Sequence, residues 1–225
     1  YSSFDSKKLI DSLKVHSMEP RLIVISSTYV YSNPLKLSQN TSFNENDFNA
    51  RLSDYTLRDR PEISYIEGKK EMESYLTNYY KSDKLVILRF PIILGFNDYT
   101  KRTLFYYNKI KNKQKFNPKK INNLSNYIFS HEVSLSIYDF INCDYTGTYN
   151  IASKETSEYE LISVYCEFFK TSIDDFLDFN LKKTRSPFYV RNNFIIDSSK
   201  YHSIFTKKID FKHNLLRELS KINVK

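Results

Sequence analysis

The chain has 225 residues, which is enough for one sizeable domain or for two small ones that share a core. Hydrophobic residues make up 40% and aromatic residues 16%, so the composition is that of a globular protein and excludes a disordered one. The formal net charge is +8, no signal peptide is visible and no apolar run approaches the about 18 residues that span a bilayer, so we expect a cytoplasmic protein without a membrane partner.

The first predicted element is an amphipathic helix over residues 4–16, where apolar residues recur at helical spacing. Pro20 separates this helix from RLIVISS, residues 21–27, a short run of branched apolar residues that predicts a buried parallel strand. Residues 32–62 are polar and rich in Asn and Ser, so we expect a long loop there. A second helix is predicted over residues 63–81.

The second buried strand is predicted over residues 84–90, KLVILRF, and Pro91 stops it. The order helix, strand, loop, helix and strand is typical of an α/β protein with parallel strands. Helices and strands continue to alternate beyond Gly95. The predicted helices cover residues 101–112, 131–141 and 157–170, the predicted strands cover 126–130, 147–153 and 193–197, and two further short helices are expected near the C-terminus.

Glycine and cysteine usage excludes several kinds of site. The three glycines, Gly68, Gly95 and Gly147, lie far apart, so these 225 residues contain no Gly-x-Gly-x-x-Gly turn and no other glycine-rich phosphate loop. Cys143 and Cys166 are also far apart, and no Cys-x-x-Cys motif exists. We therefore expect reduced cysteines, with no zinc or other metal site and no disulfide framework.

One segment is strongly basic. Residues 99–131 contain eight Lys or Arg residues and no Asp or Glu. Three interpretations stay open: a solvated surface, a contact with a phosphate-bearing small ligand, or a nucleic-acid contact. The chain lacks RNA-binding motifs with interleaved aromatic residues and a recognisable DNA-reading helix, so nucleic acid is not the expected partner.

Tyrosine and lysine recur four residues apart at three places, which are Tyr65/Lys69, Tyr80/Lys84 and Tyr107/Lys111. With 19 tyrosines and many lysines in the chain, about two such pairs arise by chance, so the spacing alone decides nothing. The sequence around each pair has to decide. Tyr65/Lys69 is the pair for which the upstream strand LIVISS runs into TYVYS, while the helix downstream holds Glu73 and is followed by LVILRFPIILG.

The neighbourhood of Tyr65 forms an ordered set of motifs. Ser26-Ser27-Thr28-Tyr29-Val30-Tyr31 ends the first strand, Tyr-x-x-x-Lys-x-x-x-Glu runs from Tyr65 to Glu73, and Leu-Arg-Phe-Pro precedes Gly95. This set resembles the extended short-chain dehydrogenase/reductase family, which contains NAD-dependent epimerases, dehydratases and reductases of nucleotide sugars. The blocks HEVSLSIYDFI, GTYNIAS and RNNFIIDSSK also resemble family segments, so the likeness covers essentially the whole chain.

The resemblance implies an α/β fold with a partial Rossmann-type parallel sheet, whose first strands are missing, and a smaller α/β substrate domain. Residues 1–95 would be the C-terminal half of the Rossmann-type domain. Residues 96–225 would mainly bind substrate, with 126–141 returning to the Rossmann sheet. In the family, a glycine-rich turn and the adenosine site precede the point where this chain starts, so we expect an N-terminally truncated protein that is inactive alone.

The resemblance also implies the site residues. Ser27, Tyr65 and Lys69 would be catalytic, and Tyr65 and Lys69 would also contact an NAD or NADP cofactor together with Pro91, Ile92 and Ile93. A tyrosine hydroxyl has a reference pKa near 10, and a lysine ammonium one helical turn away favours the phenolate. Such a tyrosine exchanges protons with a sugar hydroxyl or carbonyl, while a serine hydroxyl orients the reacting oxygen.

The substrate implied by the resemblance is a nucleotide sugar, with Thr28 and Arg191 as substrate-binding residues and Arg191 paired with the diphosphate. A planar guanidinium suits bidentate phosphate contact. The family's 4,6-dehydratases carry an acidic pair where this chain has Thr28 and Tyr29, which disfavours dehydration. STYVY, SEYELI and RNNFIIDSSK are most similar to the dTDP-4-dehydrorhamnose reductase branch.

A non-catalytic protein is the alternative from another class. The chain would then be a gene fragment, a degenerate paralogue or one half of a split enzyme. A half Rossmann sheet has an open strand edge and an uncovered apolar face, which predicts a partner such as an N-terminal half or a second copy of the chain.

Overall fold

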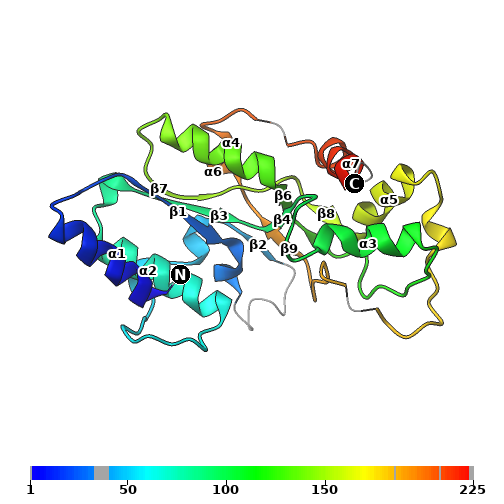
Figure 1. Ribbon diagram of the computed structural model, residues 1–225, viewed down its shortest axis with the longest axis horizontal. Helices are drawn as coiled ribbons and strands as arrows, with labels where there is room; N and C mark the ends of the chain where they lie inside the picture. Colours follow the sequence, from blue (N-terminus) through cyan, green and yellow to red (C-terminus); the bar gives the residue numbers. More distant parts are fainter. Residues whose placement is uncertain (1, 33–40, 185, 208, 223–225) are drawn as a thin grey trace.

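The computed structural model of the chain is an elongated α/β protein with two lobes (Figure 1). It describes all residues except 1, 33–40, 185, 208 and 223–225. One lobe is built on a parallel sheet with helices on both faces, and the other packs three helices around short strands. This arrangement confirms the predicted α/β class with parallel sheets.

The first lobe is organised by a three-stranded parallel sheet in the order β1-β3-β7. Its strands are β1 (Leu22–Ser27), β3 (Leu85–Phe90) and β7 (Gly147–Asn150). Every residue of β3 is buried, which explains its continuous apolar sequence. The register places Ser26, Arg89 and Asn150 side by side in one row, so the carboxyl ends of all three strands meet at the same edge of the sheet.

Helices cover both faces of this sheet (Figure 1). On one face lie α1 (Ser3–Val15) and α2 (Tyr65–Tyr79), which bury Ile10, Met72 and Leu76 against the strands. On the other face lie α4 (Ser130–Ile141) and α6 (Ser199–His202), which contribute Phe140 and Tyr201 to a second core with Val86 and Leu88. Burial of both sheet faces supplies the main driving force for this lobe.

The second lobe contains a two-stranded parallel sheet of β4 (Ile92–Leu94) and β6 (Tyr127–Phe129). Around it pack α3 (Arg102–Lys111), α5 (Glu158–Phe168) and α7 (Phe211–Ile222). Their shared core is rich in aromatic rings, with Tyr106, Phe116, Tyr165 and Phe188 almost fully buried.

A third sheet, in the order β2-β9-β5-β8, lies between the lobes (Figure 1). Its strands are β2 (Thr41–Phe43), β9 (Phe194–Ile196), β5 (Leu124–Ser125) and β8 (Thr156–Ser157). Phe43 and Phe194 pack with Tyr31 in a small separate core. Short 3₁₀ helices complete the fold: η1 (Thr28–Tyr31), η3 (Glu45–Asp47), η4 (Ala50–Leu52), η5 (Ser82–Lys84) and η6 (Ile173–Asp175).

The longer predicted elements are confirmed at nearly the expected positions, including the helices over 4–16 and 63–81 and the strands over 21–27 and 84–90. The prediction of one long loop over 32–62 is wrong, because β2, η3 and η4 fall within it; residues 33–40 lie outside the described part. The polar sequence hid these elements, since β2 has only three residues and its pairing with β9 comes from far along the chain.

The expected division of the chain at residue 95 stays a prediction. The segment 126–141 contains two elements, and they belong to different lobes. Helix α4 packs on the β1-β3-β7 sheet, whereas β6 pairs with β4 in the second lobe. The segment therefore connects the two lobes.

Candidate functional site

Ser27 is the last residue of β1, at the edge where the parallel strands end. Its side chain is 4% exposed, and its Oγ accepts a hydrogen bond from the backbone N–H of Tyr29 at 3.2 Å. This contact makes Ser27 the N-cap of η1 and turns the chain sharply after the strand. Ligands of open α/β sheets bind beyond the carboxyl ends of the strands, which is where this hydroxyl lies.

Tyr65 is the first residue of α2, immediately after the N-cap Ser64, whose Oγ accepts from the N–H of Glu67 at 3.2 Å. Tyr65 is 48% exposed, and Lys69 follows one turn later on the same face of the helix. The Nζ of Lys69 donates to the carbonyl oxygen of Ile25 at 2.8 Å and lies 5.9 Å from the centre of the Tyr65 ring. Burial lowers the pKa of Lys69, and the nearby Glu73 carboxylate opposes this shift.

A cavity of about 600 Å³ lies beside these residues. Ser27 and Tyr65 line it together with Pro91, Ile92 and Ile93 of the segment that follows β3. The remaining lining residues are Tyr29, Leu94, Gly95, Phe96, Asn97, Asp98, Tyr99, Thr100, Arg102 and Ser130. Five of the residues that the sequence singled out thus surround one hollow, although they come from three separate stretches of the chain.

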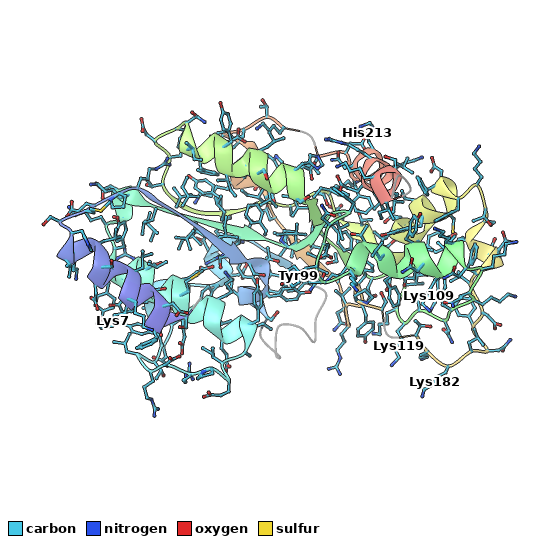
Figure 2. All side chains as sticks on the ribbon, viewed as in Figure 1. Lys7, Tyr99, Lys109, Lys119, Lys182 and His213 are labelled. Carbon is cyan, nitrogen blue, oxygen red and sulfur yellow. The ribbon has the colours of Figure 1, made fainter. Side chains whose placement is uncertain are left out.

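The loop between β4 and α3 forms one wall of the cavity. A side chain at Gly95 would bring its Cβ within 2.9 Å of Ser130 Oγ, so the loop passes α4 closely because this residue is glycine. The backbone N–H of Phe96 donates to Glu218 Oε2 at 3.0 Å, which ties the loop to α7. Tyr99 at the loop tip is 92% exposed and lies between the two lobes (Figure 2).

Asp98 and Arg102 give this wall its charge. The carboxylate of Asp98 accepts from the N–H of Thr100 at 2.9 Å and from the N–H of Arg102 at 3.1 Å, so it caps the start of α3. Burial raises the pKa of Tyr29, and the positive charge of Arg102 opposes that rise. Arg102 and Tyr29 both line the cavity, so Arg102 brings a positive charge to it.

Arg191 lies in a second pocket of about 370 Å³, which adjoins the first through a shared residue, Tyr29. Tyr189 and Phe194 also line this pocket, and the Tyr29 and Phe194 rings stack at 5.9 Å. Arg191 is exposed. The structure therefore places Arg191 in a different pocket from Ser27 and Tyr65, and Tyr29 lines both pockets.

Thr28, which the sequence proposed as a substrate-binding residue, lines neither pocket. It is 1% exposed, and its Oγ1 has no hydrogen-bond partner among the described residues. Lys69 is also absent from the cavity lining, because its ammonium group is directed to the β1 backbone. Both positions, like the other proposed roles, stay predictions.

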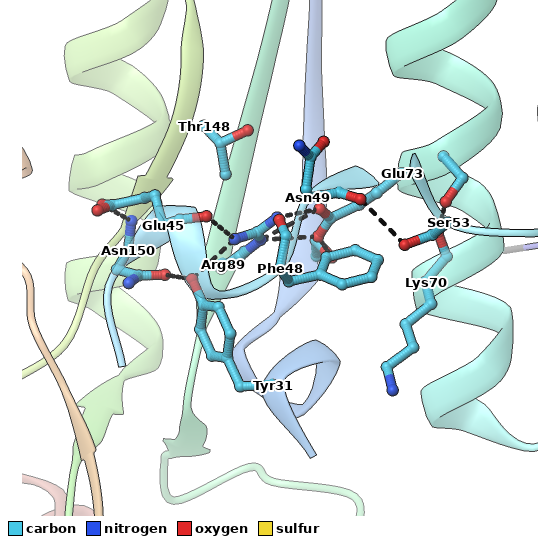
Figure 3. A network of polar contacts seen from close by, with 12 residues as sticks. Tyr31, Glu45, Phe48, Asn49, Ser53, Lys70, Glu73, Arg89, Thr148 and Asn150 are labelled. Carbon is cyan, nitrogen blue, oxygen red and sulfur yellow. Dashed lines mark hydrogen bonds and ion pairs between the residues drawn. The ribbon is translucent and has the colours of Figure 1, made fainter. Parts of the chain in front are cut away.

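A buried polar network joins β1, β3 and α2 next to Ser27 (Figure 3). The guanidinium of Arg89 donates to both carboxylate oxygens of Glu73, at 3.1 Å from Nε and 2.6 Å from Nη2. Ser26 Oγ donates to Glu73 Oε1 at 2.5 Å, Arg89 Nη1 donates to the Tyr31 hydroxyl at 2.7 Å, and that hydroxyl donates to Asn150 Oδ1 at 2.7 Å. Arg89 is 1% exposed and Glu73 is fully buried, so the pair is desolvated and mutually neutralised.

The charges in this network are stabilised by each other. Burial opposes the charge of Arg89, but the Glu73 carboxylate and the Tyr31 hydroxyl together outweigh burial and raise the pKa of Arg89. Burial raises the pKa of Tyr31 to about 12, against the opposing effect of Arg89. Sequence reasoning included Glu73 and Arg89 in the motifs but assigned them no role; the signal was a charged residue within an otherwise apolar buried strand.

Other kinds of site find little support in the described part of the chain. Among these residues no group of three or more His, Cys, Asp or Glu side chains is placed to hold a metal ion. Within the same residues no helix has both the length and the apolar character needed to cross a bilayer. Cys143 and Cys166 are both free thiols, and burial raises the pKa of Cys166 to about 11.

Several solved enzymes that act on nucleotide sugars have a similar fold. UDP-glucuronic acid 4-epimerase from Bacillus cereus in complex with NAD matches with a TM-score of 0.67 and 15% identity, over 97% of this chain and 66% of that one. dTDP-glucose 4,6-dehydratase from Bacillus anthracis in complex with NAD matches with a TM-score of 0.70 and 15% identity, over 98% and 67%. UDP-N-acetylglucosamine 4-epimerase from Bacillus cereus matches with a TM-score of 0.67 and 19% identity, over 97% of this chain and 69% of that one.

At these identities the comparison defines the class of fold, a Rossmann-like α/β fold shared with epimerases and dehydratases. The chain spans about two thirds of the length of these solved proteins. No protein-family model matches the sequence, and no curated protein matches it.

Proposed function

We propose that this chain carries the catalytic part of an NAD(P)-dependent oxidoreductase or epimerase that acts on a nucleotide sugar. The observation that carries the proposal is the cavity of about 600 Å³ into which Ser27 and Tyr65 converge beside Pro91, Ile92 and Ile93. The fold shared with nucleotide-sugar epimerases and dehydratases supports it.

The chemistry would centre on the hydroxyl of Tyr65, a residue that lines the cavity and is 48% exposed. Tyr65 would donate a proton to a sugar carbonyl, or remove one from a sugar hydroxyl. The Ser27 hydroxyl, held at the end of β1, would hydrogen-bond the same sugar oxygen and orient it. The Lys69 ammonium, on the next turn of α2, would stabilise the tyrosinate through its positive charge.

The residues present fit the nicotinamide end of an NAD or NADP cofactor. Pro91, Ile92 and Ile93 offer an apolar wall to a flat ring, and Tyr65 offers a polar group beside it, with the Lys69 Nζ 5.9 Å from the centre of the Tyr65 ring. When bound there, the nicotinamide would supply or accept the hydride of the reaction. The adenosine end has no counterpart motif in these 225 residues, which lack a glycine-rich turn. An additional polypeptide segment would hold that end.

The substrate would extend from the cavity across Tyr29 towards Arg191. The two hollows share Tyr29, and each is lined by an arginine, Arg102 in the cavity and Arg191 in the adjoining pocket. A nucleotide sugar carries its diphosphate between a sugar and a base, so this arrangement suits a ligand with its negative charge in the middle. Arg102 belongs to the basic segment that the sequence singled out.

Within this class we favour reduction of a keto sugar over elimination of water. Asp98 is the one carboxylate among the described cavity-lining residues, and it is engaged in capping α3. Tyr29 lies where the dehydratase branch carries an acidic residue. The resemblance of STYVY to the dTDP-4-dehydrorhamnose reductase branch supports the same choice.

The test compares Tyr65→Phe with Tyr80→Phe. Tyr80 belongs to a pair of the same spacing, but its hydroxyl donates to the Pro20 carbonyl away from the cavity. The assay follows reduced nicotinamide by absorbance with UDP- and dTDP-linked keto sugars. The chain is used alone and with any polypeptide encoded immediately upstream, supplied in trans. We expect Tyr65→Phe to lower the rate at least about 100-fold and Tyr80→Phe to leave it unchanged.

A non-catalytic role is the competing proposal, because Tyr65 is half exposed and the glycine-rich turn is absent from these residues. Fluorescence titration with NADH and NADPH separates the two. Failure of every form of the protein to bind either nucleotide, with or without the upstream polypeptide, would leave only the non-catalytic role.

A further inference from the structure

The Arg89–Glu73 pair lies one residue back from the candidate catalytic serine. The sheet register places Ser26, Arg89 and Asn150 in one row across three neighbouring strands, and Ser27 follows Ser26 at the end of β1. Each member of this row is at most 3% exposed. A row of polar side chains across a buried sheet is unusual, because each polar group needs a partner there.

Helix α2 supplies the partner through Glu73 and carries the candidate catalytic pair on the same face. Tyr65, Lys69 and Glu73 are successive residues at a spacing of four, so they line one side of the helix. Glu73 is bonded to Ser26, and Lys69 is bonded to the carbonyl of Ile25. Two successive turns of α2 are thus tied to neighbouring residues of β1, and Tyr65 lies on the next turn.

The contact with Glu73 is directional. Its carboxylate accepts from Arg89 through Nε and Nη2 in a fork, and this geometry fixes orientation as well as distance. Arg89 is itself held in place, because its other donors reach the Tyr31 hydroxyl at 2.7 Å and the carbonyls of Glu45 at 3.1 Å and Phe48 at 3.3 Å. Rotation of α2 about its axis would break the fork, whereas apolar packing tolerates small rotations.

A stable fold does not in general require such a pair. A buried ion pair can be replaced by apolar residues of similar volume with little loss or even some gain of stability, because desolvation offsets the attraction between the charges. Folding and orientation are therefore separable here. We propose that Arg89 and Glu73 are positioning residues that set the rotation of α2, so that Tyr65 and Lys69 face the carboxyl end of β1 beside Ser27. The kinetic part of this inference rests on the proposed function, and the geometric part does not.

The key variant replaces the pair with apolar residues, Arg89→Met together with Glu73→Leu. The matched control is Glu71→Gln, which alters another buried carboxylate of α2; Glu71 pairs with Arg60 and accepts from Ser3 Oγ at 2.9 Å, away from this row. Ser26→Ala is the milder variant, since it removes one hydrogen bond to Glu73 and leaves the ion pair intact.

Two readouts are compared with thermal unfolding. The first is the titration of Lys69, followed by NMR after ¹³C-methylation of the lysines and assigned with Lys69→Arg. The second is kcat and KM for hydride transfer. In the double variant we expect the melting temperature to be kept and kcat to fall at least about tenfold. Loss of the Glu73 carboxylate alone would lower the pKa of Lys69 further. We therefore expect an upward move of the Lys69 titration, towards that of an exposed lysine, only if the side chain leaves the β1 backbone.

The other variants complete the test. Glu71→Gln should change stability without moving the Lys69 titration or kcat, and Ser26→Ala should lower kcat several-fold with KM unchanged. A folded double variant in which the Lys69 titration does not move up and kcat stays at the wild-type value would overturn the inference. If the double variant does not fold, a Ser26→Ala variant with the wild-type Lys69 titration and the wild-type kcat would overturn the inference. If the wild type transfers no hydride, the proposed function has failed, and the Lys69 titration alone decides whether the pair positions α2.

Discussion

At the scale of single residues, Lys69 occupies an unusual place for a lysine. Its ammonium donates to the Ile25 carbonyl and lies beside the Tyr65 ring, and burial lowers its pKa from the ordinary value of 10.5. A lysine with a lowered pKa loses its charge at a lower pH than a solvated lysine does. Any function that depends on this charge is therefore lost earlier on the alkaline side.

This shift predicts the pH dependence of hydride transfer. The rate should fall as pH rises through the lowered pKa of Lys69, below 10.5, because the neutral amine no longer stabilises the tyrosinate. Lys69→Arg keeps its charge at every accessible pH, so its rate, although lower, should lack this alkaline fall. The check is the pH profile of kcat for both proteins. Identical alkaline limbs would show that Lys69 does not set the profile.

The three Tyr–Lys pairs show what the sequence can and cannot decide at this scale. Spacing is the same in all three, and the neighbouring motifs favoured Tyr65. The structure places Tyr65 at the cavity, whereas Tyr80 bonds to the Pro20 carbonyl and Tyr107 is 2% exposed in the core of the second lobe. The lining by Tyr29, Tyr99 and Arg102 could not be predicted, because it depends on how a loop and a helix from the second lobe approach β1.

At the scale of elements, three helices end in the same way without glycine. Helices α1, α3 and α5 are followed by Ser17, Lys113 and Lys170, each in the left-handed region with φ between 52° and 55°. In each case the next residue donates to a carbonyl five positions back, as Gln114 does to Lys109 at 2.8 Å. This is the Schellman motif, in which glycine is the favoured residue at the left-handed position.

Glycine at these positions should therefore stabilise the protein. Ser17→Gly, Lys113→Gly and Lys170→Gly each relieve the steric strain of a left-handed side chain, which outweighs the added flexibility of the unfolded chain, for a net gain of about 0.5 to 1 kcal/mol. The melting temperature should rise by about 2 °C per substitution. Lys109→Gly, inside α3, is the control and should lower it. A lower melting temperature in all four variants would contradict this reading of the helix ends.

Helix α4 carries a buried carboxylate at its start. Glu132 accepts from the Phe129 N–H at 3.1 Å and from Asn214 Nδ2 of α7 at 2.6 Å, so it links α4 to the second lobe. Burial raises the pKa of Glu132 from 4.5 to about 7, although both hydrogen bonds oppose the shift. The pKa of Glu132 is higher in the folded state than in the unfolded state. The contribution of protonated Glu132 to the free energy of unfolding is therefore complete below pH 4.5 and is lost as pH rises through about 7.

Glu132→Gln removes this titration while keeping the shape of the side chain. The melting temperature of the variant, relative to that of the wild type, should rise as pH increases from about 5 to about 8, because only the wild type must then ionise a buried group. Both proteins contain the other titrating groups, such as His131, whose pKa is lowered by burial. The difference between their melting temperatures therefore removes the effect of those groups. A difference that stays constant over this range would show that Glu132 does not titrate between the two states.

At the scale of the whole molecule, the candidate site lies where the two lobes meet. The first lobe contributes the end of β1 and the start of α2, and the second contributes the loop before α3 (Figures 1 and 2). The sequence predicted the long helices and buried strands, since hydrophobic periodicity and proline stops are local signals. It missed the short strands β2, β4, β5 and β8, which exist through pairing between distant segments. Both hollows depend on this long-range pairing.

The central claim is that Tyr65 exchanges a proton with a sugar while hydride moves at the adjacent carbon. Its most direct measurement is deuterium transfer from deuterated NADH or NADPH to a UDP- or dTDP-linked keto sugar, read by mass spectrometry of the sugar. The account predicts deuterium in the sugar with the wild-type protein, alone or with the upstream polypeptide, and at least about 100-fold slower incorporation with Tyr65→Phe. Incorporation at the same rate in Tyr65→Phe, or none in any form of the wild type, would contradict it.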